Sequence, residues 1–192
     1  GEGGMVTTNN KDIYKKLLML RSHGITKENM SFDIPNGDQQ GGWYYEMQDL
    51  GYNYRITDIQ AALANSQLQK ADKGIVRRHE IADKYRNAFT GASLKMQRKD
   101  EVYFNAHHLF VIEVDDRKGL YDFLREHNIF SQIHYIPVHL LPYYRKLGWN
   151  VGDFPIAESY YEQCISLPMY PTLTDEEQDF VIDKVLMYLG SK

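Results

Sequence analysis

The chain has 192 residues, 43% of them hydrophobic, and a formal net charge of −4, which suffices for one large domain or two small ones with a real core. It has no concentrated basic block and no run of about 18 apolar residues, which excludes nucleic acid as a main partner and excludes a membrane span. The single cysteine, Cys164, excludes an internal disulfide or an iron–sulfur cluster held by this chain alone, and fits a reducing, cytoplasmic setting.

The first residues predict a turn, a strand and a helix. The glycine-rich residues 1–4 (GEGG) lead into a short predicted strand over residues 5–8. Residues 10–23 carry an apolar stripe and predict a helix that Asn10 can cap at its start and Gly24 at its end.

Residues 25–52 show no clear periodicity and predict a long loop. The loop carries the aromatic group Trp43, Tyr44 and Tyr45. Two interpretations stay open: a local cluster that fixes the loop, or a contact at a subunit interface.

A long helical region follows, from residue 57 to about residue 89. Thr57 and Gln60 have the spacing of a capping box at its start. An apolar face is expected to turn inward along the whole region, and Gly74 is expected to mark a kink or a break.

Asn53 and Arg55 stand just before this cap, a neutral hydrogen-bonding group and a permanent cation. A rigid helix start with such groups suits an anionic ligand, for example a phosphate. The other interpretation is structural, with Arg55 paired to a carboxylate, and we favour it for Arg55.

From residue 106 the pattern predicts a small α/β domain. The apolar run at Cys164 indicates a buried small residue. Strands are expected over residues 108–114 and 130–136, helices over 118–127 and 154–163, and a final helix from the Thr174–Glu177 capping box.

Several segments, taken in order, resemble the DegT family of PLP-dependent nucleotide-sugar aminotransferases and, within it, the transaminases of pseudaminic acid synthesis. The likeness runs over essentially the whole chain. It is carried by residues 1–9, 21–24, 43–48, 51–63 and 132–137, and residues 1–4 and 43–63 are its most specific parts.

The resemblance implies an α/β fold, the PLP-dependent transferase fold type I of aspartate aminotransferase. Residues 1–56 would end the large PLP-binding domain, residues 57–91 would form a connecting helical region, and residues 92–192 would form the small C-terminal α/β domain. The family's Schiff-base lysine lies a few residues before GEGG, so we expect it upstream of Gly1. The chain would then hold no catalytic residue and be inactive alone.

The chain's own early lysines are not expected to replace that anchor for the cofactor. Lys11, Lys15 and Lys16 fall on the polar faces of the first helix, and Lys27 falls in a loop.

The resemblance also implies binding residues. The asparagine that matches Asn53 reaches across a homodimer to the cofactor phosphate or substrate in the partner's active site. The stretch Gln132, Ile133, His134 and Tyr135 matches a part of the sugar-nucleotide site, and sugars need convergent hydrogen-bonding groups and an aromatic face. From sequence alone, His134 would be a strand histidine with its hydrogen bonds satisfied within the fold.

The leading hypothesis is the C-terminal portion of an aminotransferase that uses PLP to move an amino group from glutamate to C4 of a UDP-linked 4-keto-6-deoxy sugar. Two alternatives stay open: a sugar 3-dehydratase of the same family, and a non-catalytic sugar-nucleotide-binding module. An unpaired strand edge would also make the chain oligomeric or prone to aggregation.

No metal site is expected. His107 and His108 stand near Asp115 and Asp116, but adjacent residues of a strand point to opposite faces and cannot easily bind one ion.

Overall fold

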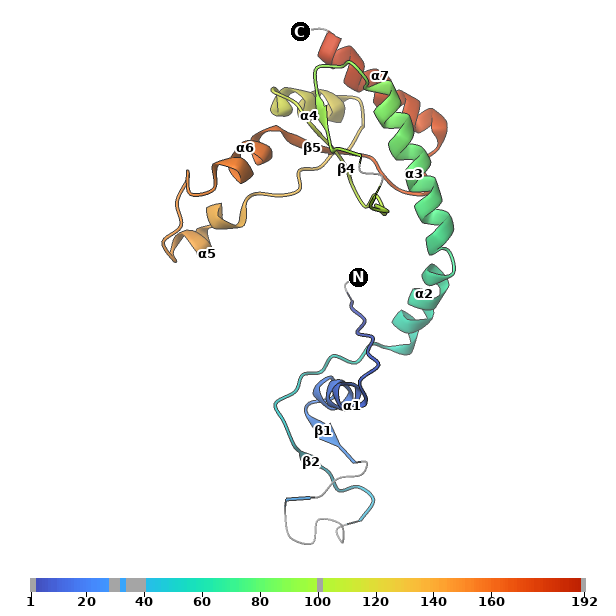
Figure 1. The fold of residues 1–192 in the computed structure, drawn as a ribbon, viewed down its shortest axis with the longest axis vertical. Coiled ribbons are helices and arrows are strands. Elements are labelled where there is room, and N and C mark those ends of the chain that lie inside the picture. The colour runs from blue at the N-terminus through green and yellow to red at the C-terminus, as the bar shows by residue number, and fades with distance from the viewer. Residues whose placement is uncertain (1–2, 28–31, 34–40, 100–101, 191–192) are drawn as a thin grey trace. The chain divides into compact units, whose positions relative to one another are not determined.

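The computed structural model describes residues 3–27, 32–33, 41–99 and 102–190 (Figure 1). The chain divides into two compact units, Gly1–Leu68 and Gln69–Lys192, here called unit 1 and unit 2. The domain boundaries expected after residues 56 and 91 stay predictions.

The helix predicted near the start of unit 1 is α1 (Lys11–Leu20). It begins where predicted, because Asn10 Oδ1 accepts a hydrogen bond from the N–H of Asp12 at 2.9 Å. It ends near Gly24, which has a φ of 70° and donates its N–H to the carbonyl of Met19 at 3.0 Å. The cap and the glycine terminus are therefore confirmed.

The strand predicted over residues 5–8 is wrong, since residues 3–8 carry no regular secondary structure. A strand needs a neighbour for its hydrogen bonds, and no described strand of unit 1 pairs with this segment. The predicted loop over residues 25–52 contains a short antiparallel sheet, formed by β1 (Ile25–Thr26) and β2 (Glu46–Met47).

The aromatic group of this loop divides in two. Tyr44 packs edge-on against Phe32 with ring centroids 5.0 Å apart, and its hydroxyl donates to Glu46 Oε1 at 2.7 Å. Trp43 is 74% exposed, and Tyr45 is exposed as well. Tyr44 thus fixes the loop locally, whereas a role of Trp43 and Tyr45 at a subunit interface stays a prediction.

The capping box predicted at Thr57 and Gln60 is confirmed, and it starts α2 (Asp58–Leu68). The N–H of Thr57 donates to Gln60 Oε1 at 3.0 Å, and the N–H of Gln60 donates to Thr57 Oγ1 at 3.3 Å. No residue of α2 is buried, and Ile59 is 84% exposed. The apolar face expected to turn inward is therefore uncovered along α2.

The single helical region predicted over residues 57–89 is two helices, because the chain turns at residues 69–70 before α3 (Ala71–Ala88). Gly74, which we expected to mark a kink or break, lies inside α3. A Cβ at Gly74 would lie 3.4 Å from Pro171 Cγ. This is an ordinary van der Waals distance, so the expected kink or break at Gly74 is not found and a Cβ would fit there.

Unit 2 contains a three-stranded antiparallel sheet in the order β3 (Lys95–Met96), β4 (Phe110–Glu113), β5 (Cys164–Leu167). β4 confirms the strand predicted over residues 108–114. All four residues of β5 are buried, so the burial predicted for Cys164 is confirmed. In the sequence, β5 shows only as an apolar run.

The strand predicted over residues 130–136 is wrong. This segment joins the sheet at one residue, where Gln132 forms an isolated antiparallel bridge with Ser166 of β5. The N–H of Gln132 donates to the Ser166 carbonyl at 3.2 Å, and the N–H of Ser166 donates to the Gln132 carbonyl at 2.8 Å. A single bridge does not continue into a strand, because the other described residues of the segment make no backbone hydrogen bond to β5.

The helices predicted after residue 106 are confirmed. The last one begins at its predicted capping box, where the N–H of Thr174 donates to Glu177 Oε2 at 2.9 Å and the N–H of Glu177 donates to Thr174 Oγ1 at 3.1 Å. The helices after β4 are α4 (Arg117–Glu126), the 3-10 turn η2 (Val138–Leu140), α5 (Pro142–Arg145), α6 (Pro155–Gln163) and α7 (Asp175–Gly190).

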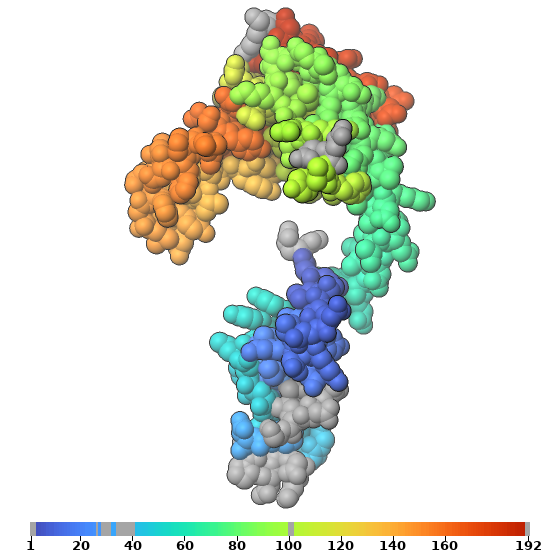
Figure 2. Space-filling view, in the orientation of Figure 1, coloured from blue at the N-terminus to red at the C-terminus, as the bar shows by residue number. Residues whose placement is uncertain are grey.

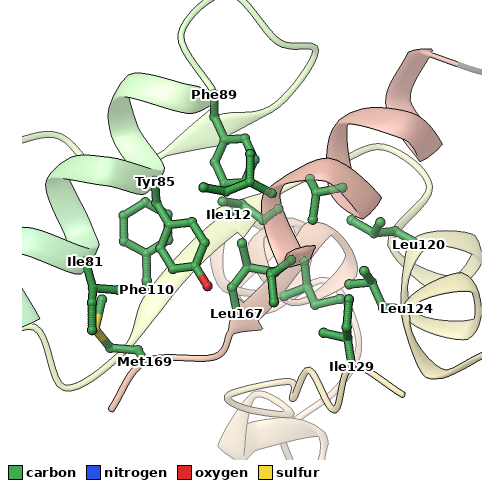
Figure 3. Close-up of a cluster of buried hydrophobic side chains, with 14 of the residues drawn as sticks. Ile81, Tyr85, Phe89, Phe110, Ile112, Leu120, Leu124, Ile129, Leu167 and Met169 are labelled. Atoms are coloured by element: carbon green, nitrogen blue, oxygen red, sulfur yellow. The ribbon is translucent and has the colours of Figure 1, made fainter. Parts of the chain in front are cut away.

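The core of unit 2 joins α3, α4, α7 and the sheet (Figure 3). Tyr85 of α3 is fully buried, and its hydroxyl donates to the carbonyl of Pro168 at 3.0 Å. The other buried apolar residues of this core include Ile81, Phe89, Phe110, Ile112, Leu120, Leu124, Ile165, Leu167, Val181 and Val185.

Arg78 of α3 binds the two chain segments that meet at one end of the β4–β5 pair. Its Nη1 donates to three backbone carbonyls: His107 at 2.9 Å and His108 at 3.2 Å, both before β4, and Met169 at 3.0 Å, after β5. These carbonyls belong to irregular chain and have no strand neighbour to satisfy them. A guanidinium suits this role because it offers several N–H donors and stays charged.

Residues 137–163, here called the arm, stand out from the packed body of unit 2 and are drawn in amber and orange (Figure 2). His139 Nε2 lies 2.8 Å from Glu158 Oε1, and both side chains are largely buried. Glu158 also accepts hydrogen bonds from the N–H groups of Gly152 at 2.9 Å and Phe154 at 3.3 Å. The hydrogen bond with His139 holds the pKa of the Glu158 carboxyl below its usual value.

We expect Arg78→Met to lower the free energy of unfolding by about 2 kcal/mol, because it removes charge-assisted hydrogen bonds to backbone carbonyls. Urea denaturation measures this as a lower midpoint with an unchanged slope. Arg98→Met is the matched control, since Arg98 is exposed and makes no ion pair or hydrogen bond among the described residues. Equal midpoints for the two variants would contradict the role of Arg78.

We expect Glu158→Gln to destabilise the protein at neutral pH but not in acid. The folded-state pKa of Glu158 is depressed, so its contribution is present above the unfolded-state pKa and is lost as the pH falls through the folded-state pKa. The difference in urea midpoint from the wild type should therefore shrink between about pH 7 and about pH 3. Glu162→Gln, an exposed carboxylate of α6, is the control. A difference that stays constant over this range would show that the Glu158 charge is not the cause.

Candidate functional site

Asn53 lies in unit 1 on the extended segment of residues 51–55, here called the ledge. It forms an isolated antiparallel bridge with Ser22, just after α1. The backbone groups of its neighbours Tyr52 and Tyr54 are hydrogen-bonded at 2.8 to 2.9 Å to the residues that close α1. The position of Asn53 is therefore fixed from both sides by main-chain hydrogen bonds.

Two glycines make this ledge possible. A Cβ at Gly51 would lie 2.2 Å from the backbone nitrogen of Gly24, and a Cβ at Gly24 would lie 1.6 Å from the carbonyl oxygen of Asp49. No side chain fits at either position, so the two backbones can lie this close only with glycine at both.

The side chain of Asn53 is presented outward. The rings of Tyr52 and Tyr54 stack at 4.9 Å with an interplanar angle of 13°, so they lie on one side of the segment. Because successive side chains of an extended segment alternate, the Asn53 carboxamide points to the other side. It is exposed and has no hydrogen-bond partner in the described part of the chain.

Arg55 is a second polar group of this ledge. It is exposed, and no carboxylate among the described residues pairs with it, so the structural ion pair that we favoured from the sequence is not found. The capping box satisfies free N–H groups of α2 internally. Asn53 and Arg55 are therefore the groups that this helix start leaves available to a ligand.

In unit 2, β5 brings the other predicted residues together. Ile133 packs against the core, while Gln132 is exposed and Tyr135 is 74% exposed. His134 is half-buried, with its Nδ1 2.8 Å from Ser166 Oγ and its ring edge-on to Tyr135 at 4.7 Å. Residues 132–135 are thus held by the packing of Ile133 and by the contact of His134 with Ser166 of β5, and the side chains of Gln132 and Tyr135 are exposed to solvent.

The sequence missed Ser166 and Glu158. Ser166 stands within an apolar run and gives no polar pattern of its own, and Glu158 gains its role only through the contact with His139. Burial raises the pKa of the thiol of Cys164, two residues before Ser166, which disfavours the reactive thiolate.

The described residues form neither a metal-binding cluster nor a membrane-spanning helix. No group of three or more His, Cys, Asp or Glu side chains among them is arranged to hold a metal ion. No helix formed by them has the length and apolar character needed to cross a bilayer. His107 is buried and its ring meets His79 edge-on at 4.8 Å, while His108 is exposed.

The chain is similar to a set of known proteins over nearly its whole length. Relatives include the uncharacterized protein MJ1066 of Methanocaldococcus jannaschii (41% identity, 96% of this chain and 49% of the relative) and the spore coat polysaccharide biosynthesis protein SpsC of Bacillus subtilis (38%, 96% and 49%). A third is the UDP-4-amino-4,6-dideoxy-N-acetyl-beta-L-altrosamine transaminase of Campylobacter jejuni (30%, 98% and 48%). The chain spans about half the length of these relatives.

Solved structures agree with this relationship. Spr1654 of Streptococcus pneumoniae, a candidate sugar aminotransferase known in PLP and PMP forms, matches 96% of this chain and 46% of its own, with 29% identity and a TM-score of 0.85 in the PMP form. Helicobacter pylori PseC, an aminotransferase of pseudaminic acid biosynthesis, matches 96% and 48%, with 27% identity and a TM-score of 0.81.

These neighbours have the PLP-dependent fold type I, and the predicted fold class is confirmed. PLP is the cofactor of this group of enzymes, as the PLP and PMP forms show. A family model matches residues 1–186. The chain belongs to the DegT/DnrJ/EryC1/StrS aminotransferase family.

Proposed function

We propose that the protein containing this chain is a homodimeric, cytoplasmic aminotransferase that moves an amino group from glutamate to C4 of a UDP-linked 4-keto-6-deoxy sugar, as in pseudaminic acid synthesis. Family membership supports amino transfer to sugars. The names of the Campylobacter and Helicobacter relatives support the choice of sugar. The observation that carries the proposal is the outward, unpartnered carboxamide of Asn53 on its fixed ledge.

The residues of the ledge fit the phosphate of PLP. Asn53 offers a neutral donor and Arg55 a cation, and neither is engaged within the described chain. When bound, PLP supplies the electron sink for amino transfer. In the proposal, Asn53 reaches the cofactor phosphate or the substrate in the active site of the partner subunit, which makes the two sites of the dimer interdependent.

The lysine that anchors PLP is proposed to lie in the half of the family's length that this chain does not span. The early lysines are poor substitutes. Lys16 lies 3.5 Å from Asp49 on exposed surface, and Lys27 lies over the ring of Tyr45 at 5.7 Å. With that placement, residues 1–56 end the PLP domain, residues 57–91 connect the domains, and residues 92–192 form the small domain.

The nucleotide sugar is proposed to bind along the segment held by β5. Gln132 and His134 supply hydrogen-bonding groups, Tyr135 supplies an exposed ring, and Ile133 sets their spacing by packing inward.

The direct test uses the whole protein, loaded with PLP and supplied with glutamate and a UDP-linked 4-keto-6-deoxy sugar. We expect an amino sugar substituted at C4, identified by mass spectrometry and NMR, and no product from the 192-residue chain alone. Loss of the C3 hydroxyl in place of amination would favour a dehydratase. Binding of the sugar nucleotide without turnover would favour a non-catalytic module.

We expect Asn53→Ala to weaken retention of PLP by about tenfold, as for loss of one hydrogen bond to a charged group, and Asn53→Asp to weaken it further by like-charge repulsion. Dialysis followed by absorbance of the bound cofactor measures this. Asn87→Asp, an exposed change on α3, is the charge-matched control. Unchanged PLP retention in both Asn53 variants would contradict a contact with the phosphate.

Mixed dimers test whether Asn53 acts across the subunits. One subunit carries Asn53→Ala, and the other lacks the PLP-anchoring lysine. If Asn53 serves the partner's site, one site of each mixed dimer is intact and activity returns. If Asn53 serves its own subunit, neither site is complete and the mixture gains no activity over the Asn53→Ala parent.

A further inference from the structure

The ring of His134 is held by β5 and not by its own segment. Ser166 Oγ lies 2.8 Å from His134 Nδ1, and Ser166 is 95% buried, since its exposed fraction is 5%. The same residue exchanges two backbone hydrogen bonds with Gln132. A single strand residue therefore sets both the main chain of the segment and the direction of its imidazole.

This contact leaves one nitrogen of the ring for a ligand. Within the described chain, His134 Nε2 has no hydrogen-bond partner, and the neighbouring ring of Tyr135 meets the imidazole edge-on at 83°. The imidazole cannot swing without breaking its bond to a buried hydroxyl. The free nitrogen is thus presented in one direction.

The partner on Nδ1 also decides which nitrogen carries the proton in the neutral ring. A serine hydroxyl can donate to Nδ1, and the ring proton then resides on Nε2. The diphosphate and carbonyl oxygens of a nucleotide sugar are acceptors only. An Nε2–H donor matches such a ligand, whereas a bare Nε2 acceptor would face those oxygens without a proton to share.

We propose that Ser166 is a positioning residue for substrate recognition: its hydroxyl donates to His134 Nδ1, holds the Nε2–H tautomer, and aims Nε2–H at an oxygen of the nucleotide sugar. This inference rests on the proposed function for the identity of the ligand. The tautomer rests on the assignment of the Ser166 hydroxyl as the donor in its 2.8 Å contact with Nδ1, and does not depend on the reaction.

The first test needs no turnover. In the whole protein with isotope-labelled histidine, nitrogen NMR at about pH 8, where imidazole is ordinarily neutral, should show His134 protonated at Nε2. Ser166→Ala should shift this signal toward a mixture of tautomers. A ring protonated at Nδ1 in the wild type would overturn the inference, whatever the reaction of the enzyme.

The second test is a double-mutant cycle on the KM for the nucleotide sugar. Ser166→Ala should raise KM by about tenfold, and by more than it lowers kcat, because one oriented hydrogen bond is lost. The same substitution in a His134→Ala background should have no further effect, and Ser166→Thr, which keeps the hydroxyl, should restore KM. Additive effects of the two alanine substitutions would overturn the inference.

The matched control is Ser131→Ala. Ser131 is also a buried serine of this region, one residue before Gln132, but its hydroxyl has no hydrogen-bond partner. Its removal should leave both the tautomer and KM unchanged. If no nucleotide sugar is turned over but the Nε2–H tautomer is found, the proposed function fails, and only the orientation of the His134 ring by Ser166 stands.

Discussion

Unit 2 depends on the pairing of β5 on both of its edges. One edge is bonded to β4, and the other accepts a single bridge from Gln132. All four residues of the strand are buried, so neither edge can shift without exposing apolar side chains. Arg78 then binds the chain before β4 and the chain after β5, which meet at one end of this pairing. The register of one short strand thereby decides where the groups of the candidate sugar site lie.

Unit 1 meets a different constraint, the close approach of two backbones at Gly24 and Gly51. Here the main chain itself, and not a packed side chain, fixes the ledge. That explains why the motif around Asn53 is recognisable in a sequence. The backbone conformation requires the glycine, the extended segment places the two tyrosines on one side, and the helix start requires the cap.

Features determined by local chemistry were predictable, and features determined by distant contacts were not. The Asn10 cap, the two capping boxes and the helices after residue 106 each follow from neighbouring residues. The segment 130–136 alternates like a strand, but whether it pairs depends on how much of β5's edge it can follow. Ser166 gains its role from a histidine distant in sequence, and no spacing rule reveals such a contact.

The contact between His139 and Glu158 has a consequence for chain length. It joins residues 19 positions apart and so closes a loop. Glu158 also binds the N–H groups of Gly152 and Phe154, so the tip of the loop lies between residues 140 and 151. The entropy lost on closing a flexible loop grows only slowly with its length, by about 0.6 kcal/mol for each doubling. Insertions near the tip should therefore have a small thermodynamic cost and leave the register of β5 unchanged.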